Sequence, residues 1–509
     1  MIKRAPVFLA LLLLGASLSA QNVLVKPYVQ PGNGGSLKDS DVKVVAWLTD
    51  QVPCDFTVEF GPKGARMRAM KPARVALDFK PAALLPPPPS SLVDAEPTPE
   101  PPPEKPQHYF KYTATLAGLP FDTEIIYRVK LGDKLVREAV FRTRASSNKP
   151  VRFVMVGDLA DGKPAQKAIA HQISLAHPDF LVALGDIVYP GGRVSEYMHH
   201  FWDTYSNAET ASAATGAPVM ASVPFYPVLG NHDTERTKLS QVPDSFGVYY
   251  FFHPPQNGPG EGPWNTPLGK DSTAVRTFRA AVGSSYPSVD FYSFDDGPTH
   301  FLVLNSAGNV DPTNATLRAW IEKDLRQTAA RWKFVCFHVP AFHGSIEHWS
   351  EQKMRLLEGL FEAGGVNIVF AGHVHNYQRS FPLRFTPSVT KPDEKKRVPG
   401  TFVLDKKFDG KTSTQPDGVL HIVSGGGGAH LYGSTYGKDS EILKKDNGDK
   451  FVPLTAKYVT DRHSFTLVDA TPTRLELRAL DEKGAEIDHI VITKPVPAPA
   501  AVEAAPASH

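Results

Sequence analysis

The chain has 509 residues, which is too many for one ordinary hydrophobic core, so two or three domains are expected. Its 55 basic and 53 acidic side chains give a formal net charge of +2. A nucleic-acid-binding protein usually has a clear excess of basic residues, and this chain has none. Proline is abundant at 46 residues, but eleven of these lie between Pro81 and Pro106, so the composition describes a globular protein with one proline-rich insertion.

The first twenty residues have the pattern of an export signal. Lys3 and Arg4 precede an apolar run at 7–14, and small residues follow up to Ala20. The apolar run is shorter than the roughly 20 residues that a membrane-spanning helix needs. We therefore expect a signal peptide at 1–20, a secreted or periplasmic mature protein and no stable membrane insertion.

Residues 21–148 carry short runs of alternating and β-branched residues without helical periodicity. Such runs at regular spacing favour an all-β sandwich. The predicted strands lie at 42–48, 55–60, 109–116, 125–131 and 139–143. The proline-rich segment 81–107 falls between two of these strands, so we expect an exposed and extended loop there.

Residues 149–494 alternate between apolar strands and helices, a pattern typical of an α/β layered fold. The predicted strands lie at 151–156, 180–184, 301–304, 333–337, 366–370, 419–423, 464–468, 474–479 and 489–493, and the predicted helices at 164–176, 315–326 and 351–362. Residues 495–509 form an Ala/Pro-rich tail. The two cysteines, Cys54 and Cys336, fall in different predicted domains, and we expect two separate buried thiols.

Polar side chains stand where several of the predicted strands end. They occur in five blocks: GDLA at 157–160, GDIVY at 185–189, GNHD at 230–233, VCFH at 335–338 and GHVH at 372–375. Each block alone is an ordinary turn or cap, but ligands of open α/β sheets bind at the carboxyl ends of strands. Oxygen and nitrogen donors without a thiolate suit Fe, Mn or Zn, and their number exceeds what one ion needs. The sequence therefore predicts a two-metal centre, which could bind a phosphate and activate a water.

The five blocks, in this order, resemble the DxG, GDxxY, GNH[DE], VxxH and GHxH pattern of the purple acid phosphatases, a branch of the calcineurin-like metallophosphoesterases. The flanking phrases VPFY at 223–226 and NYQRS at 376–380 are also similar. The resemblance implies a layered β-sandwich flanked by helices for 149–494, and a fibronectin-III-like fold for the N-terminal sandwich. One position departs from the pattern, because Ala160 stands where the family has glycine. Neither residue can coordinate a metal, so the ligand set is expected to stay intact.

The resemblance also implies the ligands of each metal ion. A ferric ion would be bound by Asp158, Tyr189 and His375, and an Fe(II), Zn(II) or Mn(II) ion by Asn231, His338 and His373. Asp186 would bridge the two ions, and a metal-bound hydroxide would attack phosphorus.

Three further residues are candidate catalytic groups next to these ligands. His232 is expected to hydrogen-bond the substrate phosphate, and Asp233 to orient His232. The family places a substrate-facing histidine nine or ten residues after the VxxH ligand. His348 fits this spacing better than His343, which we expect to be a loop histidine in contact with solvent.

Four other features favour ordinary structural roles. The glycine run 425–428 lacks the Lys-Ser/Thr of a phosphate-binding P-loop and predicts a flexible loop near the site. His199 and His200 are expected on a solvated face, and His300, just before a strand, in a structural role.

The leading hypothesis is an exported binuclear-metal acid phosphatase that hydrolyses small phosphomonoesters. A phosphodiesterase or nucleotide hydrolase on the same site stays open, because loops at the rim of the site, not the metal ligands, set the substrate. From another class, a non-catalytic surface-binding protein that keeps the scaffold also stays open. Nucleic acid is not expected as a binding partner.

Overall fold

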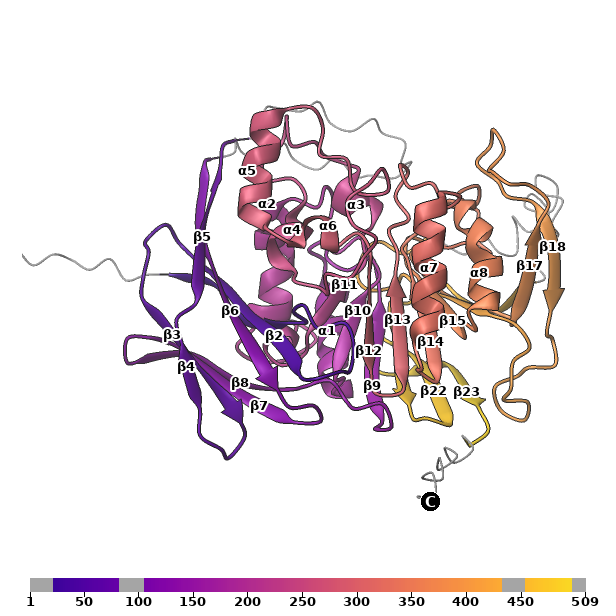
Figure 1. Ribbon diagram of the computed structural model, residues 1–509, viewed down its shortest axis with the longest axis horizontal. Coiled ribbons are helices and arrows are strands. Elements are labelled where there is room, and N and C mark those ends of the chain that lie inside the picture. The colour runs from indigo at the N-terminus through magenta and orange to yellow at the C-terminus, as the bar shows by residue number, and fades with distance from the viewer. Residues whose placement is uncertain (1–21, 82–104, 433–453, 497–509) are drawn as a thin grey trace, which may run out of the picture.

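The computed structural model describes residues 22–81, 105–432 and 454–496 (Figure 1). The predicted signal peptide, most of the proline-rich segment and almost all of the predicted tail lie outside these residues. No helix in the described part of the chain has the length and apolar character needed to cross a bilayer.

The N-terminal residues form two antiparallel sheets, drawn in indigo and purple in Figure 1 and called here the N-terminal sandwich. The first sheet has the order β1 (Val23–Gln30), β2 (Asp41–Thr49), β6 (Gln107–Leu119), β5 (Ala73–Phe79), and the second the order β4 (Arg68–Met70), β3 (Phe56–Pro62), β7 (Glu124–Leu131), β8 (Lys134–Arg142). Trp47 of β2 stacks on Tyr112 of β6 with ring centroids 5.3 Å apart, and Phe56 of β3 packs edge-on against both rings. These rings join the two sheets, and the predicted all-β architecture is confirmed. The fibronectin-III-like assignment stays a prediction.

The rest of the chain forms two larger mixed sheets, called here the layered core. One has the order β11 (Phe225–Pro227), β10 (Phe180–Ala183), β9 (Val151–Val156), β21 (Ser464–Ala470), β22 (Arg474–Asp481), β23 (Glu486–Thr493). The other has the order β12 (Tyr292–Asp296), β13 (Thr299–Val303), β14 (Trp332–Cys336), β15 (Ile368–Ala371), β19 (Leu420–Ser424), β16 (Tyr377–Ser380), β20 (Thr455–Val459). A small hairpin, β17 (Leu383–Pro387) and β18 (Gly400–Leu404), lies beside them.

The two large sheets pack face to face. The rings of Phe153 on β9 and Phe180 on β10 lie 5.0 and 5.4 Å from the ring of Phe301 on β13. Within the sheets, β9, β10 and β11 run parallel, as do β13, β14, β15 and β19. The layered β-sandwich flanked by helices is therefore confirmed, and parallel strands bring their carboxyl ends to a common edge.

Two long helices cover the outer faces of the sheets. In α1 (Pro164–Ala176), Pro164 occupies a first-turn position that needs no backbone N–H donor. In α7 (Ala315–Gln327), the side chain of Asn314 accepts the N–H groups of Thr316 and Leu317 at 3.0 and 3.2 Å and caps the helix. The buried residues of α7 recur every four positions, at Leu317, Ile321 and Leu325, and form the face that packs inward.

The predicted helix 351–362 is only partly present. The structure has a 3-10 turn η4 (Lys353–Leu357) followed by α8 (Glu358–Ala363). The four residues from Met354 to Leu357 are all buried, so this segment has no solvent-facing side for an amphipathic helix. The remaining helical segments are α2 (Val194–Glu196), α3 (Asn231–Thr234), α4 (Gly247–Phe251), α5 (Ser272–Val282), α6 (Ser285–Ser288), the π-helical turns η1 (Tyr197–Phe201) and η2 (Asp203–Asn207), and the 3-10 turn η3 (Val219–Ala221).

Both cysteines are free thiols, as predicted. Cys336 is buried, but Cys54 is only half-buried, which corrects that part of the expectation.

Candidate metal centre

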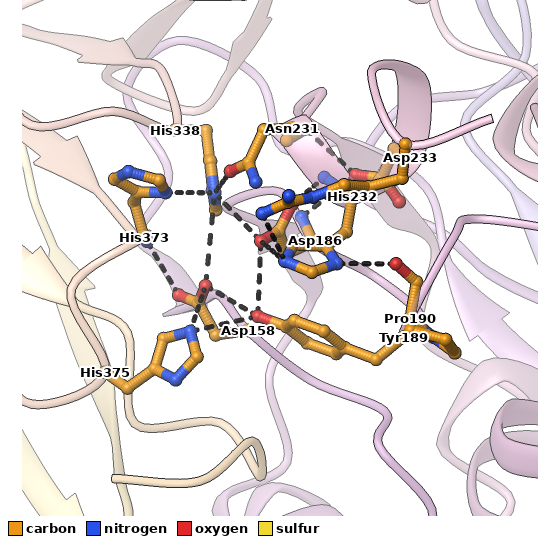
Figure 2. Close-up of polar contacts among 12 residues, drawn as sticks. Asp158, Asp186, Tyr189, Pro190, Asn231, His232, Asp233, His338, His373 and His375 are labelled. Atoms are coloured by element: carbon orange, nitrogen blue, oxygen red, sulfur yellow. Dashed lines mark hydrogen bonds and ion pairs between the residues drawn. The ribbon is translucent and has the colours of Figure 1, made fainter. Parts of the chain in front are cut away.

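The residues predicted as metal ligands follow the carboxyl ends of five strands. Asp158 follows β9, Asp186 follows β10, and Asn231 begins α3 just after β11. His338 follows β14, and His373 and His375 follow β15. Figure 2 shows that these side chains, together with Tyr189, converge on one small volume.

One half of this volume is centred on the hydroxyl of Tyr189. The Tyr189 oxygen lies 3.0 Å from Asp158 Oδ1, 3.2 Å from Asp186 Oδ2 and 3.1 Å from His375 Nε2. His375 Nε2 is in turn 3.3 Å from Asp158 Oδ1. The structure therefore brings together the three residues expected to bind the first ion.

The other half is centred on His338. Its Nε2 lies 3.2 Å from each of Asn231 Oδ1, His373 Nδ1 and Asp186 Oδ2. Asp186 Oδ2 thus contacts both halves, which is the position expected of a bridging carboxylate. The ligand atoms of Asp186, His338 and His373 all lie within 4.8 Å of one another. A buried, closely spaced set of imidazole, carboxylate, amide and phenol donors fits borderline and hard metal ions.

Hydrogen bonds to the backbone decide which imidazole nitrogen can bind a metal. Nδ1 of His338 donates to Leu184 O at 2.8 Å, and Nδ1 of His375 donates to His430 O at 2.6 Å. A carbonyl oxygen only accepts, so Nδ1 carries a proton in each ring, and Nε2 is the nitrogen that faces the site and would bind a cation once it has no proton of its own. His373 is turned the other way, with Nδ1 facing His338 and Nε2 3.2 Å from Glu351 Oε2.

Three of these residues adopt left-handed backbone conformations that are costly for non-glycine residues. The φ angles are 60° at Asp158, 50° at Asp186 and 68° at His373. Such strain persists only where the surroundings enforce it, and it clusters at functional sites. In the turns after β9, β10 and β15, this strained backbone conformation directs the three side chains into the site.

Electrostatics also prepares the site for cations. Although burial opposes ionisation, the nearby His338 and His232 lower the pKa of Asp186, so its carboxylate is charged. For Tyr189, burial together with the charges of Asp158 and Asp186 raises the pKa, so a phenolate forms only beside a strongly polarising cation.

The role expected for Asp233 is not what the structure shows. Its carboxylate accepts the backbone N–H groups of Asp186, Ile187 and Gly230, at 2.9, 3.1 and 2.9 Å. Asp233 therefore ties the Asp186 turn to the Asn231 turn, and no hydrogen bond joins it to His232 in the described structure. His232 is held by Pro190 instead, because its Nδ1 donates to the carbonyl oxygen of that residue at 2.6 Å.

His348 lies beside the candidate ligands. Its ring centroid is 3.8 Å from that of His373, its Nε2 is 3.3 Å from the Tyr432 hydroxyl, and its Nδ1 is 3.4 Å from Glu351 Oε1. His343 is buried rather than in contact with solvent, because its ring packs against Trp349, and burial lowers its pKa to about 3. Glu351 and Tyr432 are thus neighbours of the site that the motif blocks did not include.

The glycine run 425–428 is near the site, as expected, but it is buried and hydrogen-bonded rather than a flexible loop. Gly427 N donates to Gly157 O, and Ala429 N donates to Asp158 O, both at 3.0 Å. A Cβ at Gly425 would lie 2.4 Å from Val374 O and 2.8 Å from Asp158 Oδ2, so only glycine fits. The sequence signal for such close backbone packing was the run of four glycines directly after strand β19.

The remaining expectations concern residues around the centre. Ala160 is fully buried and its N–H donates to Ile187 O at 3.2 Å, so the extra methyl is accommodated. His199 is exposed as expected, whereas His200 is half-buried. The structural role of His300 is confirmed, because Asp295 and Asp324 each bind one of its ring nitrogens at 2.8 Å.

Comparisons with known proteins agree with this architecture. Residues 151–377 match the family model of the calcineurin-like phosphoesterases. Purple acid phosphatase 1 of Ipomoea batatas is 27% identical over 53% of this chain and 53% of its own length. Purple acid phosphatase 23 of Arabidopsis thaliana is 29% identical over 52% of this chain and 56% of its own length. The chain therefore spans about half the length of the curated relatives that it matches.

Among solved structures, a purple acid phosphatase from yellow lupin (Lupinus luteus) seeds aligns with a TM-score of 0.57 and 17% identity. The alignment covers 92% of this chain and 74% of the lupin chain, and it shows a shared fold.

Proposed function

We propose that the protein is an exported binuclear-metal phosphatase of small phosphomonoesters, because residues 151–377 match the calcineurin-like phosphoesterase model and the chain is similar to purple acid phosphatases. One observation carries the proposal. Asp186 Oδ2 lies 3.2 Å from both the Tyr189 hydroxyl and His338 Nε2, so one carboxylate joins two clusters of metal-binding side chains. The proposal includes activity at acid pH, because the relatives are named as acid phosphatases.

The side chains fall into two sets of donors. Asp158, Tyr189 and His375 would hold a ferric ion, and Asn231, His338 and His373 an Fe(II), Zn(II) or Mn(II) ion, with Asp186 between them. A ferric first ion is proposed because a phenolate oxygen such as that of Tyr189 is a ligand that suits a strongly polarising cation. When bound, the two ions would activate a water for attack on phosphorus and neutralise phosphate charge.

The chain's own contribution is to orient the ligands and the substrate. Asp233 holds the Asp186 and Asn231 turns at a constant separation through three backbone N–H groups. His232, anchored at Nδ1 by Pro190 O, presents Nε2 to the site, where a protonated ring would donate to a phosphate oxygen. His348 presents a second imidazole from the side of His373.

Metal analysis and one ligand variant test the proposal. We expect about two metal ions per chain and hydrolysis of p-nitrophenyl phosphate, which Asp186→Asn lowers by more than about 100-fold. Asp417→Asn is the matched control, because this exposed carboxylate pairs with Arg384 at the surface. Equal activity in Asp186→Asn, or far fewer than two ions in active protein, would refute the binuclear mechanism.

Substrate preference is tested with the same protein. We expect a higher kcat/KM for p-nitrophenyl phosphate than for bis(p-nitrophenyl) phosphate. The reverse order would assign the site to phosphodiesters instead.

A further inference from the structure

Arg236 is a cation at the edge of the site that no motif block includes. It lies two residues beyond α3 (Asn231–Thr234), and its side chain is exposed. Its Nη2 is 3.3 Å from His232 Nε2. A guanidinium has five N–H donors and no acceptor, so Arg236 donates and the neutral imidazole accepts. Within the described residues Arg236 forms no ion pair with a carboxylate, so most of its donors remain available to a ligand.

Two glutamates, Glu347 and Glu351, lie near His348, away from Arg236. Glu351 contacts both His348 and His373, at 3.4 and 3.2 Å. Glu347 Oε2 is a buried oxygen without a hydrogen-bond partner in the described structure. A negatively charged group on a substrate would therefore be repelled on the His348 side and attracted on the Arg236 side.

We propose that Arg236 binds a second anionic group of the substrate, namely a carboxylate or phosphate on the alcohol half of the phosphomonoester. The inference rests on the proposed phosphatase function. A phosphate at the metal centre beside His232 would bring its ester substituent within reach of Arg236, because Arg236 Nη2 lies only 3.3 Å from His232 Nε2. A planar guanidinium suits this task, since its paired N–H groups match the two oxygens of a carboxylate or phosphate.

Non-hydrolysable ligands test the inference independently of turnover. Calorimetry on the metal-replete, full-length protein would compare methylphosphonate with phosphonoacetate and methylenediphosphonate, which add a carboxylate or a second phosphonate. We expect at least one of the two ligands with a second anionic group to bind about tenfold more tightly than methylphosphonate. We expect Arg236→Gln to remove most of that preference. The ligand with the larger loss identifies the anionic group that Arg236 prefers. Arg236→Lys should retain part of the preference, because it keeps the charge without the planar fork.

Arg326→Gln is the matched control, since this exposed arginine pairs with Glu322 on α7 and makes the same change in charge. An unchanged preference in Arg236→Gln would overturn the inference. A uniform loss for all three ligands would also overturn it, because Arg236 would then only position His232. If wild type shows the expected preference but hydrolyses no phosphomonoester, the proposed function fails while the anion-binding role of Arg236 stands.

Discussion

At the scale of single residues, the side chains of the candidate metal centre are aimed mainly by backbone groups. His338 and His375 each use Nδ1 to donate to a carbonyl oxygen, which leaves Nε2 toward the site. Asp233, expected to orient His232, instead collects three backbone N–H groups and joins two turns. The roles of these residues therefore depend on main-chain atoms that residue-type patterns do not describe.

Tyr189 provides the most direct spectroscopic test. We expect a visible charge-transfer band from a phenolate bound to ferric ion in the iron-loaded protein, and its loss in Tyr189→Phe, because only the hydroxyl contacts Asp158, Asp186 and His375. Absorption spectra with parallel iron analysis would measure it. Tyr432→Phe, which removes a nearby hydroxyl outside the predicted ligand set, should keep the band. A band that persists in Tyr189→Phe would assign the phenolate to another residue.

At the scale of elements, a charged cluster fastens α7 to the sheet of the layered core that contains β12 and β13. His300 on β13 lies between Asp295 on β12 and Asp324 on α7, with 2.8 Å to each carboxylate. Burial alone would lower the pKa of His300, but the two carboxylates outweigh it and raise the pKa to about 9. The ring is therefore an imidazolium that joins three elements.

This cluster makes stability depend on pH. The folded pKa lies above the unfolded value of about 6.5, so the stabilisation is complete below pH ~6.5 and is lost as the pH rises through about 9. We expect His300→Gln to cost about 2–3 kcal/mol of unfolding free energy at pH 6 and much less at pH 9. Denaturant unfolding at both values would measure this. His108→Gln is the control, because its partner Asp78 is exposed. An equal cost at both values would contradict a charged His300.

The strands β5 and β6 flank the proline-rich segment and pair with each other directly. Their register brings Phe79 opposite Gln107, so the connection between them closes an antiparallel pair in the N-terminal sandwich. All the predicted metal ligands lie beyond residue 150. We expect deletion of 86–103 to leave metal content unchanged and kcat within about twofold, since shortening a loop changes closure entropy only slightly. Metal analysis and steady-state kinetics would measure both. A large loss of kcat would place the segment at the rim of the site.

At the scale of the whole molecule, the N-terminal sandwich and the layered core share one hydrophobic cluster. Tyr28 of β1 packs on Trp202 with ring centroids 4.8 Å apart, and Phe79 of β5 packs on Tyr250 at 5.4 Å. Buried polar contacts add to it, because Lys111 donates to Tyr250 O at 2.9 Å.

A buried cluster of charged residues adds to the interface between the N-terminal sandwich and the layered core. Arg144 donates to Asp41 Oδ1 at 2.9 Å and to Asp295 O at 3.2 Å, so it links β2 to β12. Removing one partner from such a group leaves an uncompensated buried charge, which is strongly destabilising. The sandwich is therefore part of the scaffold that carries the site.

We expect the metal-free protein to unfold in one cooperative transition, because neither part can lose the shared cluster without exposing apolar surface. Differential scanning calorimetry would measure it. A chain restricted to residues 149–494 should aggregate, since the faces of Trp202 and Tyr250 that meet the sandwich would be exposed. Two separated transitions, or a soluble and folded 149–494 fragment, would contradict a shared core.

Much of this protein could be predicted from the sequence because the decisive signals are local. Apolar runs marked most strands of the layered core, and the polar residues directly after them marked the edge where Asp158, Asp186 and His338 meet. Such signals need only neighbouring residues, and parallel strands carry them to a common edge.

Other features depended on contacts between distant segments. Asp324 approaches His300 across 24 positions, Ala429 hydrogen-bonds to Asp158, and Arg236 meets His232 after a helical turn. Residue types and periodicity specify which face of an element is buried, but not which distant group will lie 3 Å away. The sequence by itself therefore determined the fold class and the candidate ligands. The tertiary structure alone decided how those ligands are oriented, what charges surround them and how the two parts share a core, because each depends on how the segments pack.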